Sequence, residues 1–107
     1  KGADIIIMPT AWVPGPLKSP QFRTLISARA IENTVYMVAC DQVGANAMGE
    51  SVVVDPMGVV VASAGEVETL ICAEIELRKF VQNFRHIKTA DRNFTPYRKF
   101  REDICFH

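Results

Sequence analysis

The sequence lacks several patterns by which common activities are recognised. Its 3 cysteines include no C-x-x-C pair, so neither a disulfide framework nor a zinc ribbon is expected. Neither G-x-x-x-x-G-K-[ST] nor G-x-G-x-x-G occurs, which argues against a nucleotide-binding α/β domain. There is no G-x-S-x-G elbow, and the 2 histidines, His86 and His107, lie late in the chain, which argues against a serine hydrolase. We expect no metal and no cofactor.

Long apolar runs and an excess of one charge are also missing. No run of about 18 apolar residues and no secretory leader is present, so we expect no membrane association and a cytoplasmic location. Net charge is +0, but residues 1–77 hold 4 basic and 9 acidic side chains, whereas residues 78–107 hold 8 and 3. This basic surplus is too small to predict nucleic-acid binding. We expect the basic end to pack on acidic surface of its own chain or of a partner subunit.

The first half of the 107 residues predicts a strand, a helix and a second strand. Ala3–Met8 and Val35–Asp41 are apolar runs without alternation, which is typical of strands buried on both faces. Between them, Ser19 as cap and Pro20 at the first helical position predict a helix that ends near Asn33, a residue that tolerates a left-handed turn. Such a βαβ unit places its two strands parallel, with the helix across one face.

The loop after the first strand is the best candidate for a binding site. It contains four prolines between residues 9 and 20, which make it stiff and unable to join a ladder. Open α/β sheets bind ligands at the carboxyl edge of their strands, so we predict that Thr10, Ala11 and Trp12 form a wall of the substrate pocket. The alternative is that Trp12 fills the core.

The second half predicts a hairpin, another strand and a short helix. Ser51–Val54 and Val59–Ala62 flank Asp55-Pro56-Met57-Gly58, which matches the residue preferences of a type I turn. Leu70–Ile75 is predicted as a strand, and the spacing of apolar residues predicts a helix over 77–86. Residues 87–107 form a basic and aromatic tail without period, which we expect to pack on its own or a partner subunit.

An arginine in the predicted helix calls for a partner. Phe22, Leu25 and Ile26 mark an apolar stripe, and helical spacing adds Arg29 to it, with Glu32 and Asn33 beside it. We predict that Arg29 and Glu32 form a buried structural pair. Truncating Arg29 to alanine would then cost about 3 to 5 kcal/mol.

The three cysteines are interpreted as structural or incidental. Cys40 and Cys72 lie in apolar, strand-like runs, where a thiol acts as a small hydrophobe. Cys105 lies near the end of the sequence and is interpreted as incidental.

The order of several segments resembles the C-terminal half of nitrilase-superfamily carbon–nitrogen hydrolases. The segments are KGADIIIMPTAW at 1–12, RTLISARAIENTVY at 23–36, SVVVDPMG at 51–58 and AEIEL at 73–77. Together they extend the resemblance over residues 1 to about 86. Two positions depart from the family, whose members often carry asparagine in place of Asp41 and histidine or a small residue in place of Glu50.

The resemblance implies an α/β fold, namely the C-terminal half of a four-layer α-β-β-α sandwich, and subunits paired through helices. It also implies a Glu-Lys-Cys catalytic set that forms a cysteine acyl-enzyme. All three family residues precede the segment that matches 1–12, so no catalytic residue maps onto this chain, and Cys40 is not a substitute.

The sequence begins on Lys1 rather than methionine, and an apolar run starting at Ile5 follows almost at once. We expect preceding structure to supply the neighbours of that strand, so the chain is interpreted as a fragment. Residues 1–86 would be the C-terminal half of a hydrolase domain acting on small linear amides or carbamoyl compounds, in a dimer or higher homo-oligomer. The alternative is a non-catalytic half-domain that serves as an oligomerisation or scaffold module.

Overall fold

The computed structural model describes residues 2–77 of the chain. By its contacts the chain divides into two units, and Asp4–Ala73 forms the unit that contains the sheet and the helix. The fold described below is the fold of this unit. Apart from Leu77, the helix predicted over 77–86 and the tail predicted over 87–107 lie outside the described residues.

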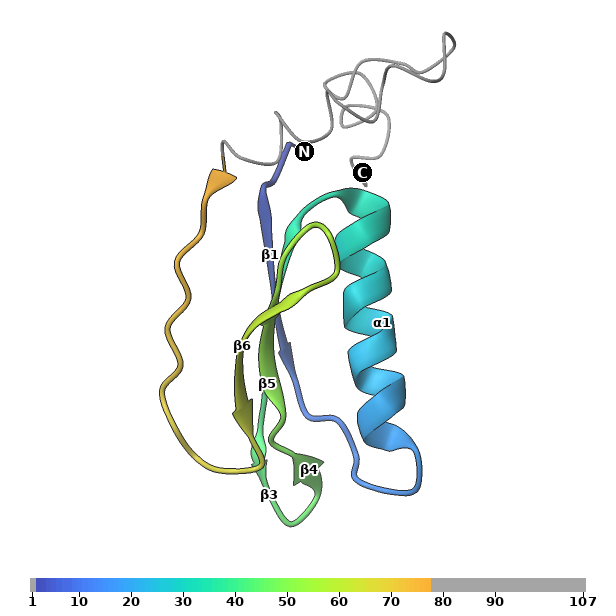
Figure 1. Cartoon of the computed structure of the whole chain (residues 1–107). Helices are drawn as coiled ribbons and strands as arrows, with labels where there is room; N and C mark the ends of the chain where they lie inside the picture. Colours follow the sequence, from blue (N-terminus) through green and yellow to red (C-terminus); the bar gives the residue numbers. More distant parts are fainter. Residues whose placement is uncertain (1, 78–107) are drawn as a thin grey trace, which may run out of the picture. The chain divides into compact units, whose positions relative to one another are not determined.

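A four-stranded mixed sheet and one long helix make up the unit (Figure 1). The elements are β1 (Ile5–Thr10), α1 (Lys18–Asn33), β2 (Tyr36–Asp41), β3 (Val43–Gly44), β4 (Ala47–Met48), β5 (Ser51–Val54) and β6 (Val60–Gly65). The strand order is β1-β2-β5-β6, and β3 pairs with β4 as a separate small hairpin. β1 and β2 are parallel, as the βαβ pattern predicted, and β2, β5 and β6 are antiparallel neighbours.

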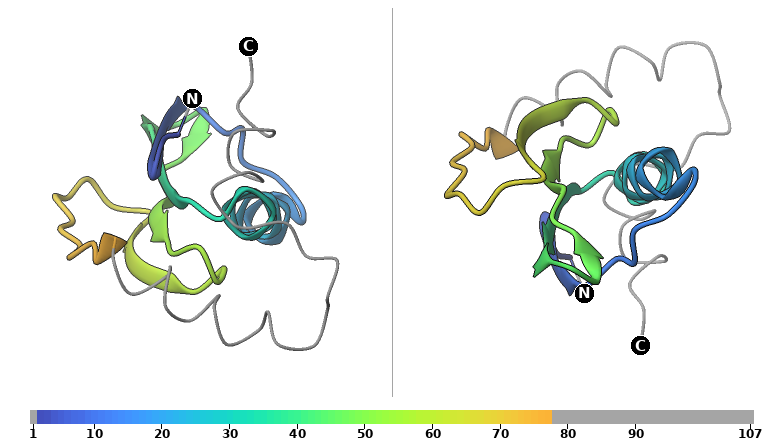
Figure 2. Two further views of the ribbon diagram at one scale, coloured as in Figure 1. Left: turned by 90° about the horizontal axis from the view of Figure 1, so that it is seen from above. Right: turned by 90° about the horizontal axis from the view of Figure 1, so that it is seen from below.

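Figure 2 shows α1 along one face of the sheet, and the core residues come from both elements. From α1 the core takes Phe22, Ile26 and Ala30, which are spaced four residues apart and so share one side of the helix. From the sheet it takes Met37, Ala39, Val52 and Val54. These four alternate along β2 and β5 and therefore point to the same face.

The ends of α1 differ from the prediction in their capping. Leu17 precedes the helix in a left-handed conformation with φ 62°, and no side chain caps the first turn. Ser19 is therefore not the cap, because its hydroxyl donates to the Glu50 carboxylate instead. The helix ends at Asn33 as predicted, but the left-handed residue is Thr34, with φ 52°.

The prediction that β1 is buried on both faces is wrong for this chain. Among residues 2–77, β1 pairs with β2 alone and so lies at the edge of the described sheet. Ile5 is 37% exposed and Ile7 is 67% exposed. Both alternate with Met8, which packs on the core under α1, so they point to the sheet face away from the helix. No described residue covers them fully.

The predicted strand Leu70–Ile75 is not found, and the two cysteines interpreted as structural are not covered by residues 2–77. Residues 68–76 have no regular secondary structure, and Leu70 is 87% exposed. A strand needs a neighbour to share its ladder, and none of the described strands pairs with this segment. Cys72 lies in it and is exposed; Cys40 is exposed because it alternates with Ala39 and so leaves the α1 face of the sheet.

The hairpin predicted at Asp55–Gly58 is confirmed. β5 and β6 are antiparallel, with two register irregularities, and the Gly58 N–H donates to the Asp55 carbonyl at 2.9 Å. The Asp55 carboxylate oxygen Oδ1 also accepts from the N–H groups of Met57 and Val59, at 2.8 and 2.9 Å. Within residues 2–77, no helix has both the length and the apolar character needed to cross a bilayer.

Candidate functional site

The carboxyl ends of β1 and β2 meet at one edge of the sheet. The parallel register pairs Thr10 with Asp41, the last residues of the two strands, and the Gln42 N–H extends this ladder by donating to the Thr10 carbonyl at 2.9 Å. Thr10 and Trp12 are half-buried and Ala11 is exposed. The predicted wall residues therefore do leave the sheet at the edge where α/β folds bind ligands.

Asp41 joins the two loops at this edge. Its Oδ1 accepts from the Trp12 backbone N–H at 2.7 Å, and its Oδ2 accepts from the Gly49 N–H at 3.0 Å. The residue is 6% exposed. Its own backbone is held by Ser51, whose Oγ accepts from the Asp41 N–H at 2.9 Å and donates to the Asp41 carbonyl at 3.2 Å. We call these four residues the Asp41 clamp.

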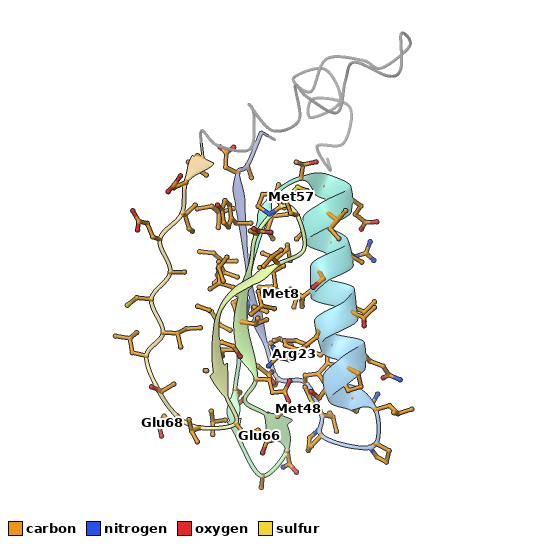
Figure 3. All side chains as sticks on the ribbon, viewed as in Figure 1. Met8, Arg23, Met48, Met57, Glu66 and Glu68 are labelled. Carbon is orange, nitrogen blue, oxygen red and sulfur yellow. The ribbon has the colours of Figure 1, made fainter. Side chains whose placement is uncertain are left out.

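A second buried carboxylate joins α1 to the sheet. Glu50 is 8% exposed, and its Oε2 accepts from the Ser19 hydroxyl at 2.8 Å and from Arg23 Nε at 3.2 Å. Arg23 also donates through a second guanidinium nitrogen to the Ser63 hydroxyl on β6, at 3.1 Å. Figure 3 shows Arg23 between α1 and the sheet. Both carboxylates that depart from the family pattern, Asp41 and Glu50, are therefore engaged in holding elements together.

The Trp12 ring packs inward rather than standing free. Its centroid lies 5.5 Å from that of Phe22, with the planes tilted by 49°, and Lys18 Nζ lies 5.8 Å from it on the ring face. The ring packs against the hydrophobic core, and its buried Nε1 has no hydrogen-bond partner among residues 2–77. The ring thus contributes to the core, and its role as a wall of the substrate pocket stays a prediction.

A polar pocket of about 360 Å³ lies beside the Asp41 clamp. Its lining residues come from β2, β3, β5, β6 and the segment after β6: Asp41, Val43, Ser51, Ala64, Val67, Glu68 and Thr69. Asp41 and Ser51 belong to both the pocket and the clamp. Thr10, Ala11 and Trp12 are not among the lining residues.

The pair of Arg29 and Glu32 is present, but it is not buried. Arg29 donates to the Glu32 carboxylate one turn later, with side chains 62% and 50% exposed. The Asn33 side chain donates to the Arg29 carbonyl at 3.0 Å. The predicted stripe combined two neighbouring rows of helix positions. The row that contains Phe22 is buried there, whereas Leu25, which precedes Arg29 by four residues on the other row, is 47% exposed.

Local spacing did not reveal the partners of the two buried carboxylates. Ser19, Arg23, Gly49, Ser51 and Ser63 were not predicted as site residues, because their contacts join positions 8 to 40 residues apart. The one indication of these contacts in the sequence was the charged Arg23 directly after Phe22, a residue of the apolar stripe. Within residues 2–77, no group of three or more His, Cys, Asp or Glu side chains is placed to hold a metal ion.

Solved structures of nitrilase-fold proteins share this arrangement of helix and sheet. NitFhit of Caenorhabditis elegans superposes with a TM-score of 0.67 at 38% identity, over 80% of this chain and 22% of that protein. Nit3 of Saccharomyces cerevisiae gives 0.67 at 34% identity, over 86% of this chain and 36% of that protein. A carbon–nitrogen hydrolase of Helicobacter pylori gives 0.67 at 23% identity, which shows the fold alone. The fold class is therefore the α/β fold of the nitrilases.

Residues 1–83 match the family model of the carbon–nitrogen hydrolases, and the chain belongs to this family. It is similar to the deaminated glutathione amidase of Escherichia coli O157:H7, with 47% identity over 75 residues, which is 70% of this chain and 29% of that protein. The omega-amidase of Saccharomyces cerevisiae is 39% identical over 106 residues, covering 91% and 35%. The 2-oxoglutaramate amidase of Bacillus subtilis is 36% identical over 95 residues, covering 85% and 36%. The chain thus spans about a third of the length of these relatives.

Proposed function

We propose that the chain is part of an amidase-type carbon–nitrogen hydrolase that acts on small linear amides or carbamoyl compounds. Hydrolysis proceeds through a cysteine acyl-enzyme formed by a Glu-Lys-Cys set, which belongs to polypeptide preceding Lys1. Three relatives of the chain carry the name of an amidase, which supports the reaction class. The contribution of this chain is the sheet edge at Thr10 and Asp41, which forms one side of the substrate site.

The environment of the thiols is the observation that carries this division of labour. A nucleophilic cysteine needs a base or a cation that stabilises its thiolate. Cys40 and Cys72 are free, exposed thiols, and neither side chain has a hydrogen-bond partner among residues 2–77. The carboxylates at the edge are occupied as well, Asp41 by two backbone N–H groups and Glu50 by Arg23 and Ser19. Residues 2–77 therefore offer neither the nucleophile nor its base, which supports the proposal that both belong to polypeptide preceding Lys1.

The rest of the domain also supplies cover for the open face of the sheet. Ile5 and Ile7 are 37% and 67% exposed on the face away from α1, and a second sheet stacked there gives the four-layer α-β-β-α sandwich. On α1, Leu25 is 47% exposed, which supports pairing of two subunits through their helices in a homo-oligomer. A cytoplasmic location completes the proposal.

Ammonia release tests this function. The full-length protein and the chain 1–107 are each incubated with an ω-amide of a dicarboxylic acid, a simple aliphatic amide and a carbamoylated amine. We expect the full-length protein to release ammonia from at least one of them and the chain alone to release none. Ammonia from the chain alone would overturn the placement of the catalytic residues. An inactive full-length protein would favour the non-catalytic module instead.

A further inference from the structure

The Asp41 carboxylate is buried, and its two oxygens accept hydrogen bonds from two different loops. Oδ1 is 2.7 Å from the N–H nitrogen of Trp12, in the loop after β1, and Oδ2 is 3.0 Å from that of Gly49, between β4 and β5. Asp41 has no ion-pair partner among residues 2–77. Because a buried charge is costly unless it is hydrogen-bonded, the carboxylate and the two loops depend on one another.

The same two loops are also joined directly. The Trp12 carbonyl accepts from the Met48 N–H at 2.9 Å, so the Trp12 peptide is held on both sides. Gly49 has φ +75°, and a Cβ there would lie 2.9 Å from Val43 Cγ2, so the backbone passes close to β3. The loop after β1 and the turn between β4 and β5 thus form one rigid piece centred on Asp41.

We infer that Asp41 is a positioning residue for substrate binding, which fixes the Thr10–Trp12 wall to the β4–β5 turn so that the edge keeps one shape. This inference rests on the proposed function. Asp41 and Ser51 also line the pocket of about 360 Å³, so the rigid piece borders the space beside the edge. In this chain the role uses both carboxylate oxygens, whereas asparagine, which family members often carry here, offers one oxygen and would turn its NH₂ group toward one of the two donors.

The chain contains a matched control for this chemistry. Asp55 also accepts from two backbone N–H groups, those of Met57 and Val59, at 2.8 and 2.9 Å. It lies in the turn after β5, whereas Asp41 is bonded to Ser51 at the beginning of β5. Asp55→Ala therefore removes a similar pair of hydrogen bonds away from the proposed substrate edge and is matched to Asp41→Ala.

The experiment compares Asp41→Asn, Asp41→Ala and Asp55→Ala in the full-length protein by steady-state kinetics and residue-resolved amide exchange. Asp41→Asn is expected to speed exchange at Trp12 or Gly49, and Asp41→Ala at both. With the best amide substrate, Asp41→Asn should raise KM about fivefold or more, the equivalent of one lost hydrogen bond, and change kcat less than about twofold. Asp55→Ala should speed exchange at Met57 and Val59, whose N–H groups share the Asp55 oxygen Oδ1, and leave KM unchanged.

The outcomes separate this inference from the proposed function. Faster exchange at Trp12 or Gly49 with an unchanged KM would show that Asp41 is structural only and would overturn the inference. Unchanged exchange in both Asp41 variants would show that the clamp does not form, with the same consequence. A wild-type protein that hydrolyses none of the amides would overturn the proposed function and the substrate role together, whereas amide exchange would still decide whether the two loops are coupled.

Discussion

Arg23 on α1 and Glu50 before β5 form an ion pair that joins the helix to the sheet, with Nε 3.2 Å from Oε2. The side chains are 35% and 10% exposed, so the carboxylate is well shielded while the guanidinium keeps contact with water. Because Ser19 and Ser63 are bonded to the same pair, the amino-terminal half of α1 is fixed to both the β4–β5 connection and β6. This network holds the helix at the end where the proposed substrate edge lies.

Removing the Glu50 carboxylate is expected to destabilise the full-length protein. Glu50→Ala leaves the Arg23 guanidinium and the Ser19 hydroxyl without their acceptor and should lower the free energy of unfolding by about 2 kcal/mol, less than for a fully buried pair. Glu50→Gln keeps an acceptor and should cost about half as much. Urea unfolding measures both, with the exposed Glu66→Gln as control. Equal values for Glu50→Ala and Glu66→Gln would contradict the network.

Ser51 is expected to matter more than Ser63, although both lie on strands of the same sheet. Ser51→Ala leaves the Asp41 N–H without the acceptor that it has at 2.9 Å, and should cost about 1 kcal/mol of unfolding free energy. Ser63→Ala removes only an exposed acceptor of Arg23 and should cost less than about 0.5 kcal/mol. The two variants are compared by urea unfolding, and a larger loss for Ser63→Ala would be inconsistent with the clamp.

The turn at Gly58 is expected to depend on Ile31 at the end of α1. Gly58 has φ +82°, and a Cβ there would lie 2.6 Å from Ile31 Cδ1; Gly65 has φ +69° with nothing within 4 Å. Gly65→Ala should therefore cost only the conformational strain of about 1 kcal/mol, and Gly58→Ala more. Truncating Ile31 to alanine should reduce the cost of Gly58→Ala to that of Gly65→Ala. A thermal-unfolding cycle without such coupling would show that the turn does not contact the helix.

Arg29→Ala is expected to have a small effect on the chain as the structure shows it. Because the Arg29–Glu32 pair is at least half exposed, its loss should cost less than about 1 kcal/mol of unfolding free energy, in place of the 3 to 5 kcal/mol of a buried pair. The measurement is urea unfolding of chain 1–107, with Glu32→Ala as the matched variant. A loss of unfolding free energy above about 3 kcal/mol would instead support the prediction of a buried pair.

The elements near the helix could be predicted from the sequence, because their patterns are local. The parallel pairing of β1 with β2 follows from strand, helix and strand in succession, and the turn at Asp55–Gly58 follows from its residue types. Their burial could not be predicted in the same way. Apolar residues such as Ile7 and Cys40 indicate that a surface will be covered, but they do not tell which polypeptide covers it.

The polar contacts at the sheet edge are missing from the prediction for a different physical reason. In the sequence, Asp41 and Glu50 are distinguished as departures from a family pattern. Their partners Trp12 and Arg23 lie 29 and 27 residues away. No helical or strand period relates such positions, since the contacts arise only after the sheet has formed. A polar residue at a half-buried position therefore indicates that a hydrogen-bonding partner exists, but the sequence does not identify that partner.

The most direct test of the account is to identify the thiol that carries the acyl group. The full-length protein is quenched in acid during turnover of its best amide substrate, digested, and the acylated peptide is located by mass spectrometry. We predict that the acyl group is on a cysteine outside residues 1–107 and that Cys40→Ser and Cys72→Ser leave kcat within about twofold of wild type. An acyl group on Cys40, Cys72 or Cys105, with loss of turnover in the corresponding serine variant, would contradict the account.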